Sequence, residues 1–478
     1  MRSLWLAHCF GMQVETLYLK PVQTGFPQDS DAALVARVSG GCASAACHAS
    51  ALLPGGGAGR FASSGGSGVL ARTLFAWREA VSPHLAVQRE GHGVGDRELV
   101  AALAAEVASF AASGLPEPSA SSSSASSPSG TRRRLVLVET AGGVASPGPS
   151  GTLQADLLRP LRLPSLLVGD GRLGGISATL SSLDSLLLRG YDVPMVVLMD
   201  ESGANTAAVQ QHVGAHVRVL PFPRCLEPPP LRAPATAGWA AGSEQQQQQQ
   251  QQPDPNLQAW LDECAPQFDE LLLAVQQAHE HRLEALHAAA AESRRILWWP
   301  FTQHGNVAGN EAVTVIDARA GERFAVFRPG GGNAAGSSTA SIATGSGGAG
   351  AAGAGTSALQ LQYDACASWW TQGLSAAAQP RLVAAVARAA GRYGHVMYPE
   401  NAHEPALALA RALLASVGVG WAARVFFSDN GSTAVEVRCL RLAPGLQGTG
   451  GGGGTLGSMC SPAGREARGW AAPRHIHR

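Results

Sequence analysis

A lysine and two acidic residues carry the clearest chemical signal in this sequence. Lys20 ends a short apolar run, and Thr24 and a glycine follow it. An ammonium group in that position suits a phosphate, carboxylate or carbamate. Asp31 and Glu139 supply the carboxylate oxygens that Mg²⁺ prefers, with water and phosphate oxygens as its other ligands. Each signal alone is weak, because a lysine after a strand is commonly a solvated surface charge.

Two glycine-bearing segments could bring backbone N–H groups to the same ligand. Gly142 and Gly143 directly follow a polar turn, and glycines allow the backbone to approach a ligand closely. A second segment opens a predicted helix, and a helix N-terminus favours a carboxylate or phosphate. Its residues are Arg172, Leu173, Gly174, Gly175, Ile176 and Ser177.

Short apolar runs stand before these polar residues and are typical of buried parallel strands. The runs are LYLKPV, RRLVLV, SLLVG and VPMVVLM. Between the last two, residues 176–190 have apolar residues at helical spacing and end in a glycine, which indicates a βαβ unit. The sequence therefore predicts an α/β domain with a parallel sheet. Because such sheets bind ligands at the carboxyl ends of their strands, the polar segments should gather there.

Composition separates these patterned blocks from segments that are poor in large apolar residues. We expect disordered inserts or linkers there, because too little apolar area is available to offset the cost of ordering. They are residues 40–70, 113–131, 226–258 with eight consecutive glutamines, 329–357 and 444–464. By contrast, residues 265–296 predict one long helix between the two halves of the chain.

Charge and cysteine content exclude some classes of partner. The formal net charge is 0 at pH 7, so no electrostatic argument favours a nucleic acid or an anionic membrane as partner. The 8 cysteines have no metal-binding spacing, which favours a reducing compartment without structural zinc. No apolar run approaches the ~20 residues that cross a bilayer, so we expect no membrane partner.

In order and spacing, the first-half segments resemble dethiobiotin synthetase. The matching stretches include LYLKPVQTGFPQDSDA, LFAWREAVSPHLAVQREG and VETAGGVASPGPSGTLQADLLRPLRLPSLLVGDGRLGG. They cover residues 14–39, 73–91 and 134–203, and they are similar to the fusion form of plants and algae. The resemblance implies a P-loop-NTPase-like parallel sheet that uses ATP and Mg²⁺. Its substrates would be 7,8-diaminopelargonate and CO2, joined into the ureido ring of dethiobiotin.

The resemblance also implies roles for single residues. Lys20 would be catalytic and would stabilise the carbamate and the transferring phosphoryl group, and Thr24 would contact the substrate. Asp31 and Glu139 would hold magnesium, and Gly142 and Gly143 would lie at the nucleotide. The backbone of residues 172–177 would receive the substrate carboxylate across the interface of a homodimer.

One part of the family pattern is missing from this sequence. The family opens with a strand and a G-x-x-x-x-G-K-[ST] loop whose amides and lysine cradle the phosphates. No Gly-Lys-Ser or Gly-Lys-Thr occurs here. We therefore expect the first strand and the phosphate loop to lie outside this chain.

The second half contains a further pattern of strand, turn and helix. VFF at residues 425–427 predicts a buried strand, and the polar turn after it opens a helix that could present N–H and hydroxyl groups to an anion. The tryptophan pairs at 298–299 and 369–370 could wall an apolar channel, although such pairs are more commonly core residues.

WWPFTQ, DACASWWTQG, GHVMYPENAHEPA and FFSDNGSTAVE resemble the class III aminotransferase that makes diaminopelargonate. The match spans about residues 297–437 and implies a partial aminotransferase domain dependent on pyridoxal 5'-phosphate. The substrates would be 8-amino-7-oxononanoate and S-adenosylmethionine. Gly431, Ser432 and Thr433 would bind the cofactor phosphate, and Trp369 and Trp370 would line the substrate pocket.

Lys20 is the single lysine of the sequence, so we expect the lysine that binds the cofactor to lie outside this chain too. The predicted organisation is a synthetase-like domain (1–225), a linker (226–258), a helical connector (259–296), a partial aminotransferase domain (297–443) and a tail (444–478). Two hypotheses remain: an incomplete bifunctional biotin-synthesis enzyme, mitochondrial by resemblance, or a non-catalytic interaction or regulatory remnant of it. An unrelated ATPase is the weaker third reading.

Overall fold

The computed structural model describes the parts of the chain that carry the predicted strands and helices. They are residues 14–39, 42–44, 69–112, 133–215, 217–223, 255–299, 302–327, 359–365, 378–396 and 401–442. Most of each predicted insert lies outside the described residues, as does the predicted tail. The chain divides into two compact units, Met1–Val383 and Ala384–Arg478.

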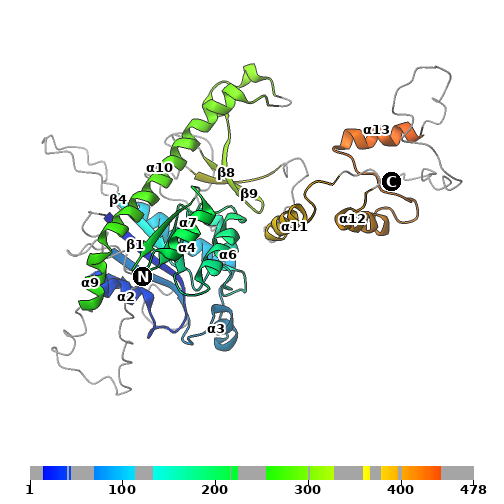
Figure 1. The fold of residues 1–478 in the computed structure, drawn as a ribbon. Coiled ribbons are helices and arrows are strands. Elements are labelled where there is room, and N and C mark those ends of the chain that lie inside the picture. The colour runs from blue at the N-terminus through cyan, green and yellow to red at the C-terminus, as the bar shows by residue number, and fades with distance from the viewer. Residues whose placement is uncertain are drawn as a thin grey trace. The chain divides into compact units, whose positions relative to one another are not determined.

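Two parallel sheets form the core of the first unit and confirm the predicted α/β character (Figure 1). One sheet has the order β2-β3-β1-β4 and the other has the order β5-β6-β7, with every pairing parallel. The strands are β1 (Val14–Gln23), β2 (Cys42–Ser44), β3 (Val69–Ala76), β4 (Arg133–Val138), β5 (Leu166–Asp170), β6 (Met195–Met199) and β7 (Arg218–Phe222). β2 falls within the range 40–70, where an insert was predicted.

Helices connect these strands and cover both faces of the sheets. They are α2 (Asp31–Ser39), α3 (Pro83–Glu90), α4 (Asp96–Ala112), α5 (Gln154–Leu157), η2 (Arg159–Leu161), α6 (Gly175–Leu187) and α7 (Ala204–Val213). The predicted helix over 176–190 is confirmed as α6. None of the described helices is both long enough and apolar enough to cross a membrane.

Alternation along β1 decides which side chains face the candidate site. Leu17 and Leu19 are buried in a cluster with residues of α4, whereas Tyr18 is buried in a cluster with residues of α2. Side chains of a strand point to opposite faces in turn. Lys20 therefore lies on the face that α2 covers, two residues beyond Tyr18.

Helices α9 (Pro255–Glu263) and α10 (Ala265–Ile296) pack on the second parallel sheet. Phe268 of α10 lies in one buried cluster with Met195 and Phe222, the latter 5.1 Å from it between ring centroids. The predicted long helix over 265–296 is confirmed by α10. Its apolar face, rather than helix propensity alone, fixes it to the sheet.

The far end of α10 lies beside an antiparallel sheet that we did not predict (Figure 1). This sheet has the order β10-β9-β8 and is built from β8 (Val315–Ala320), β9 (Arg323–Phe327) and β10 (Leu359–Tyr363). Leu286 and Ala290 of α10 pack with Val315 and Phe327 in a small buried cluster. One helix therefore contacts both kinds of sheet in the first unit.

The second unit contains α12 (Glu404–Ala415) and α13 (Gly431–Leu442), and α11 (Ala378–Tyr393) crosses the division between the units. The buried strand predicted at residues 425–427 is wrong: these residues form no strand, and Phe426 is 66% exposed. A strand needs a neighbour to satisfy its backbone groups, and the described residues of this unit offer none. The helix predicted after the polar turn is confirmed as α13.

Candidate active site

Lys20, Asp31 and Glu139, which the sequence predicts in one site, meet in the structure. Nζ of Lys20 is 2.6 Å from Oδ2 of Asp31 and 3.1 Å from Oε1 of Glu139. Nζ also donates to the carbonyl oxygen of Thr140 at 3.3 Å. Lys20 is only 5% exposed, so the two carboxylates rather than bulk water balance its charge. The arrangement provides a cation and two anions at one point of the sheet.

Tyr18 belongs to this cluster and was missed by the sequence analysis. Its hydroxyl donates to Oε2 of Glu139 at 2.8 Å, and the residue is 1% exposed. Tyr18 opposes Leu137 across the β1–β4 pairing, two residues before Glu139. The signal that could have found it is its spacing from Lys20, because residues two apart on a strand share a face. The hydroxyl fixes one oxygen of Glu139 and leaves the other to Lys20.

Gln23 holds the start of α2, and with it Asp31, against the end of β1. Its side-chain oxygen accepts from the backbone N–H of Asp31 at 3.1 Å. Its amide nitrogen donates to the carbonyl oxygens of Thr24 at 2.9 Å and Asp29 at 2.8 Å. Gln23 is 6% exposed and was also missed. Thr24, the predicted substrate contact, lies half-buried on this turn, next in sequence to the amide that orders it.

The turn after Glu139 is ordered by its own hydroxyl groups. Thr140 Oγ1 donates to the carbonyl oxygen of Gly142 at 2.8 Å, and the N–H of Gly143 donates to Ser146 Oγ at 2.9 Å. Gly142 has a φ of 96°, a left-handed conformation that favours glycine. Both glycines are exposed, and their contact with a ligand stays a prediction.

A cavity of about 360 Å³ adjoins this cluster. It lies between β4 and β5, which are edge strands of the two parallel sheets. Tyr18, Glu139 and the turn at 140–143 line one part of it. The rest of the lining is largely apolar and includes Leu135, Val136, Leu137, Val138, Leu166, Leu167 and Val168. Gln154 also lines it, is 4% exposed, and has an amide nitrogen without a hydrogen-bond partner.

The predicted segment 172–177 comprises the turn after β5 and the first residues of α6. Arg172 is paired with Asp170, whose carboxylate accepts from both its backbone N–H at 2.9 Å and its Nε at 2.8 Å. Leu173, Gly174 and Ser177 are exposed, whereas Gly175 is buried and Ile176 is half-buried. Within the described residues no hydrogen bond or ion pair joins this segment to Lys20. The turn is thus accessible, and its link to the cluster stays a prediction.

Asp200, which the sequence analysis did not single out, orders the loop after β6. Its Oδ2 accepts from the N–H of Thr206 at 2.8 Å, and its Oδ1 accepts from Ser202 Oγ at 3.0 Å. Burial alone would raise the pKa of Asp200, but these hydrogen bonds and that of the Thr206 hydroxyl outweigh it and lower the pKa. The carboxylate is therefore a structural anchor for α7 at the carboxyl end of the second sheet.

In the second unit, Gly431, Ser432 and Thr433 form the first turn of α13, as predicted. The side-chain oxygen of Asn430 accepts from the N–H of Thr433 at 2.9 Å and caps the helix. Gly431 and Ser432 are exposed. Trp369 and Trp370, the predicted pocket residues, lie outside the described residues.

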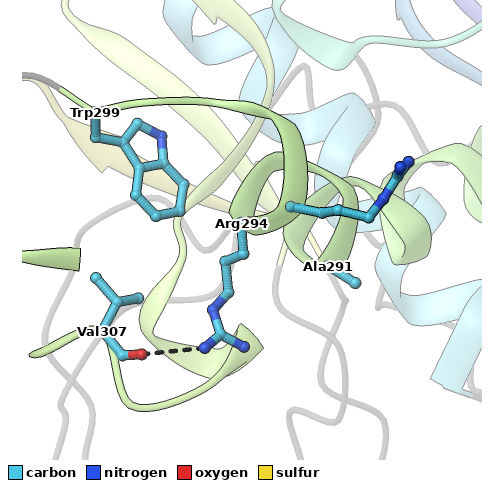
Figure 2. A pocket seen from close by; sticks show the side chains of 5 residues that line it. Ala291, Arg294, Trp299 and Val307 are labelled. Atoms are coloured by element: carbon cyan, nitrogen blue, oxygen red, sulfur yellow. Dashed lines mark hydrogen bonds between the residues drawn. The ribbon is translucent and has the colours of Figure 1, made fainter. Parts of the chain in front are cut away.

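The other tryptophan pair lies at the end of α10. Trp299 lines a cavity of about 330 Å³ with Ala291, Arg294, Arg295 and Val307, and Trp298 is 84% exposed (Figure 2). In Figure 2 the guanidinium of Arg294 points to the carbonyl oxygen of Val307, to which it donates at 3.2 Å. This cavity is polar as well as aromatic. The apolar channel suggested for the two tryptophan pairs stays a prediction.

Comparisons with known proteins find relatives that match both halves of the chain. Residues 79–222 match a family described as an AAA domain. Over 89% of its length the chain is 39% identical to the bifunctional dethiobiotin synthetase/7,8-diamino-pelargonic acid aminotransferase, mitochondrial, of Oryza sativa subsp. japonica. It is 37% identical, also over 89% of its length, to the protein of that name in Arabidopsis thaliana.

A fungal protein gives the same result at lower coverage. The chain is 36% identical over 77% of its length to the bifunctional dethiobiotin synthetase/adenosylmethionine-8-amino-7-oxononanoate aminotransferase of Emericella nidulans. The matched parts are 46%, 47% and 40% of the rice, Arabidopsis and Emericella proteins. The chain is therefore a relative of the bifunctional dethiobiotin synthetase/diaminopelargonic acid aminotransferases, and it spans about half the length of these curated relatives.

Proposed function

We propose that the first unit carries the dethiobiotin synthetase site of a bifunctional biotin-synthesis enzyme. The observation that carries this proposal is the position of Lys20 between Asp31 and Glu139, beside the glycine turn at 140–143. Glu139 is 119 positions from Lys20, and its meeting with Lys20 and Asp31 was predicted only through the family resemblance and the sheet topology. Their convergence supports a site for anionic substrates and a divalent cation.

The proposed reaction builds up negative charge that this cluster would offset. An amine of 7,8-diaminopelargonate attacks CO2 and loses a proton, which gives a carbamate. A carbamate oxygen then attacks the γ-phosphorus of ATP, and ADP leaves. The second amine attacks the carbamate carbon, loses a proton, and expels phosphate as the ring closes. Lys20 would hold the carbamate and phosphoryl oxygens by its charge, so positioning and neutralisation supply the rate enhancement.

The donor set fits magnesium. Two carboxylates already converge on one cation, and Mg²⁺ is commonly held by one or two carboxylates together with water and substrate phosphates. Within the described residues no group of three or more His, Cys, Asp or Glu side chains could hold a metal. Asp31 and Glu139 would therefore hold magnesium only in company with ATP, whose phosphate charge the ion would neutralise.

The cavity between β4 and β5 supports a place for the strand and phosphate loop with which the family opens. Its two walls are β4 and β5, each an edge strand of a parallel sheet with apolar side chains, and it borders the Glu139 turn. A parallel strand in that place would pair with both edges, and a backbone carbonyl would give the amide of Gln154 its missing acceptor. A loop after such a strand would reach the ATP phosphates beside Lys20.

For the second half we propose the amino-terminal part of the aminotransferase. Gly431, Ser432 and Thr433 at the start of α13 would bind the phosphate of pyridoxal 5'-phosphate. When bound, that cofactor would supply transamination of 8-amino-7-oxononanoate with S-adenosylmethionine as donor. We further expect a homodimer, in which residues 172–177 meet the substrate of the other subunit, and a mitochondrial location. The domain ranges predicted from the sequence remain part of this proposal.

Substrate binding by the chain tests the synthetase site directly. Calorimetric titration with 7,8-diaminopelargonate in bicarbonate buffer, with magnesium and ATP present, should give saturable binding. Lys20→Met should weaken it by about a hundredfold, in line with the loss of one preorganised charge. Binding is the better readout than turnover because the sequence contains no Gly-Lys-Ser or Gly-Lys-Thr phosphate loop.

Arg89→Gln is the matched control, since Arg89 is a cation in an exposed pair with Glu79 on the same unit. It should bind the diamine as the unchanged chain does. If the unchanged chain binds neither the diamine nor magnesium and ATP, or if Lys20→Met binds as well as the control, the proposed site is wrong.

A further inference from the structure

Protein acceptors surround the ammonium group of Lys20. A lysine has three N–H donors. Three acceptors lie within 3.3 Å of Nζ: Oδ2 of Asp31, Oε1 of Glu139 and the carbonyl oxygen of Thr140. Nζ donates hydrogen bonds to Glu139 and Thr140 and forms an ion pair with Asp31, so at most one of its N–H groups is left for a substrate oxygen while these contacts hold. In this arrangement the two carboxylates compete with any substrate oxygen for the ammonium group.

Magnesium would compete for the same two carboxylates. By formal charge, Lys20 with Asp31 and Glu139 is one cation facing two anions, in surroundings where their side chains are 7%, 31% and 14% exposed. A divalent cation bound to both carboxylates would reverse the sign of the cluster. It would also repel a second cation that kept its place at the same oxygens.

We propose that Lys20 is the internal counter-ion of Asp31 and Glu139, and that magnesium bound by these carboxylates displaces its ammonium group toward the anionic substrate. This inference rests on the proposed synthetase function and adds an order of events to it. The metal binds first, and Lys20 becomes available as a result. Without the metal, the lysine keeps the two carboxylates paired.

Tyr18 keeps the Glu139 carboxylate in place while Lys20 is replaced by the metal. Its hydroxyl holds Oε2 of Glu139 at 2.8 Å, so the carboxylate stays in place while Oε1 changes its partner from Nζ to the metal. The carbonyl oxygen of Thr140 continues to accept from Nζ and limits how far the ammonium moves. That bond keeps the displaced charge at the turn 140–143, where Gly142 and Gly143 are exposed.

Because Lys20 is the single lysine of the sequence, its side chain can be observed selectively. Protein labelled with isotopic lysine gives one lysine side-chain signal in a heteronuclear NMR spectrum. Magnesium chloride titrated into the full chain, with and without ATP, should shift that signal saturably. Exchange of its Nζ protons with water should accelerate several-fold, because two carboxylate partners are lost. Potassium chloride at matched ionic strength controls for screening.

Variants assign the effect to the two carboxylates. In Asp31→Asn/Glu139→Gln the lysine signal should no longer respond to magnesium. Glu79→Gln, which changes an exposed carboxylate of the same unit, should respond as the unchanged chain does. Should the double variant fail to fold, the titration of the unchanged chain still decides the matter.

The displacement and the proposed function can fail separately. If the diamine binds in a way that depends on Lys20 and magnesium, yet magnesium leaves the lysine signal unmoved, the synthetase site stands and the displacement is wrong. If magnesium at millimolar concentration with ATP does not bind at all, and the diamine does not bind either, both are overturned. A saturable shift that the double variant loses supports the displacement.

Discussion

Arg282 and Asp317 form a bidentate ion pair between α10 and β8. Nη2 of Arg282 is 2.6 Å from Oδ2 of Asp317, and its Nε donates to Oδ1 at 3.1 Å. Arg162, next to η2, adds a third contact, with its Nε 3.1 Å from Oδ2. The Asp317 side chain is only 4% exposed. One buried carboxylate thus connects the synthetase-like part of the first unit, the long helix and the antiparallel sheet.

Asp317→Asn should destabilise the first unit, because it leaves two partly buried arginines without their shared anion. Loss of one partner of a buried pair costs about 3 kcal/mol. Urea denaturation should show that loss. The substitution should also accelerate backbone hydrogen exchange in β8 and β9 more than in β1. Arg89→Gln, in an exposed pair, should change stability by less than about 0.5 kcal/mol. Equal effects of the two variants would contradict a role for burial at Asp317.

Gly175→Ala should disrupt the turn between β5 and α6. A Cβ atom at Gly175 would collide with the backbone carbonyl of Asp170. This is a backbone group, so it cannot move aside as the end of a flexible side chain could. We expect a loss of more than about 2 kcal/mol in the free energy of unfolding. At Gly143 the nearest atom to an added Cβ is 3.9 Å away, so Gly143→Ala should cost less than about 0.5 kcal/mol. Thermal unfolding of the two variants side by side measures the difference.

The sequence predicted features that depend on local pattern or on sheet topology. β1, β4, β5, β6, α6 and α10 follow from apolar runs and helical spacing. The meeting of Lys20 with Asp31 and Glu139 follows from the rule that carboxyl ends of parallel strands share an edge. These patterns are read from neighbouring residues, so one sequence is enough to see them.

Features that depend on distant pairing escaped prediction. In the sequence, Tyr18 is indistinguishable from the other residues of an apolar strand. Only the fold shows that its hydroxyl contacts Glu139, 121 positions away. The Asp317 ion pairs likewise join segments whose partners no local pattern reveals. The same limit explains the wrong strand at 425–427, where apolar residues suit a strand but the described residues provide no neighbouring strand.

Tyr18→Phe should weaken both the fold and the order of the Glu139 carboxylate. It removes a buried hydrogen bond to a charged oxygen, which contributes about 2 kcal/mol. Urea denaturation should show this loss, whereas Tyr363→Phe, at a residue that is 66% exposed, should change stability by less than about 0.5 kcal/mol. If Tyr18→Phe is as stable as the unchanged chain, the hydroxyl does not hold Glu139.

The Asp200 carboxylate should make the stability of the first unit sensitive to acid. Hydrogen bonds from Thr206 and Ser202 lower its pKa in the folded state, whereas the unfolded chain has the ordinary value of about 3.9. The folded state therefore binds the proton less readily. The stabilising contribution of the carboxylate is present above the unfolded value and is lost as the pH falls through the folded one.

Asp200→Asn should consequently be less stable than the unchanged chain at neutral pH, and the gap should narrow as the pH falls below about 4. Urea denaturation at several pH values measures the gap. Glu201→Gln removes the exposed acidic residue next in sequence and should give a small difference that does not follow this pattern. A gap for Asp200→Asn that stays constant down to the lowest pH would mean that the amide loses packing or hydrogen-bond geometry rather than the charge. In that case Asp200 would hold α7 by its shape alone, and its lowered pKa would have no part in the stability of the loop after β6.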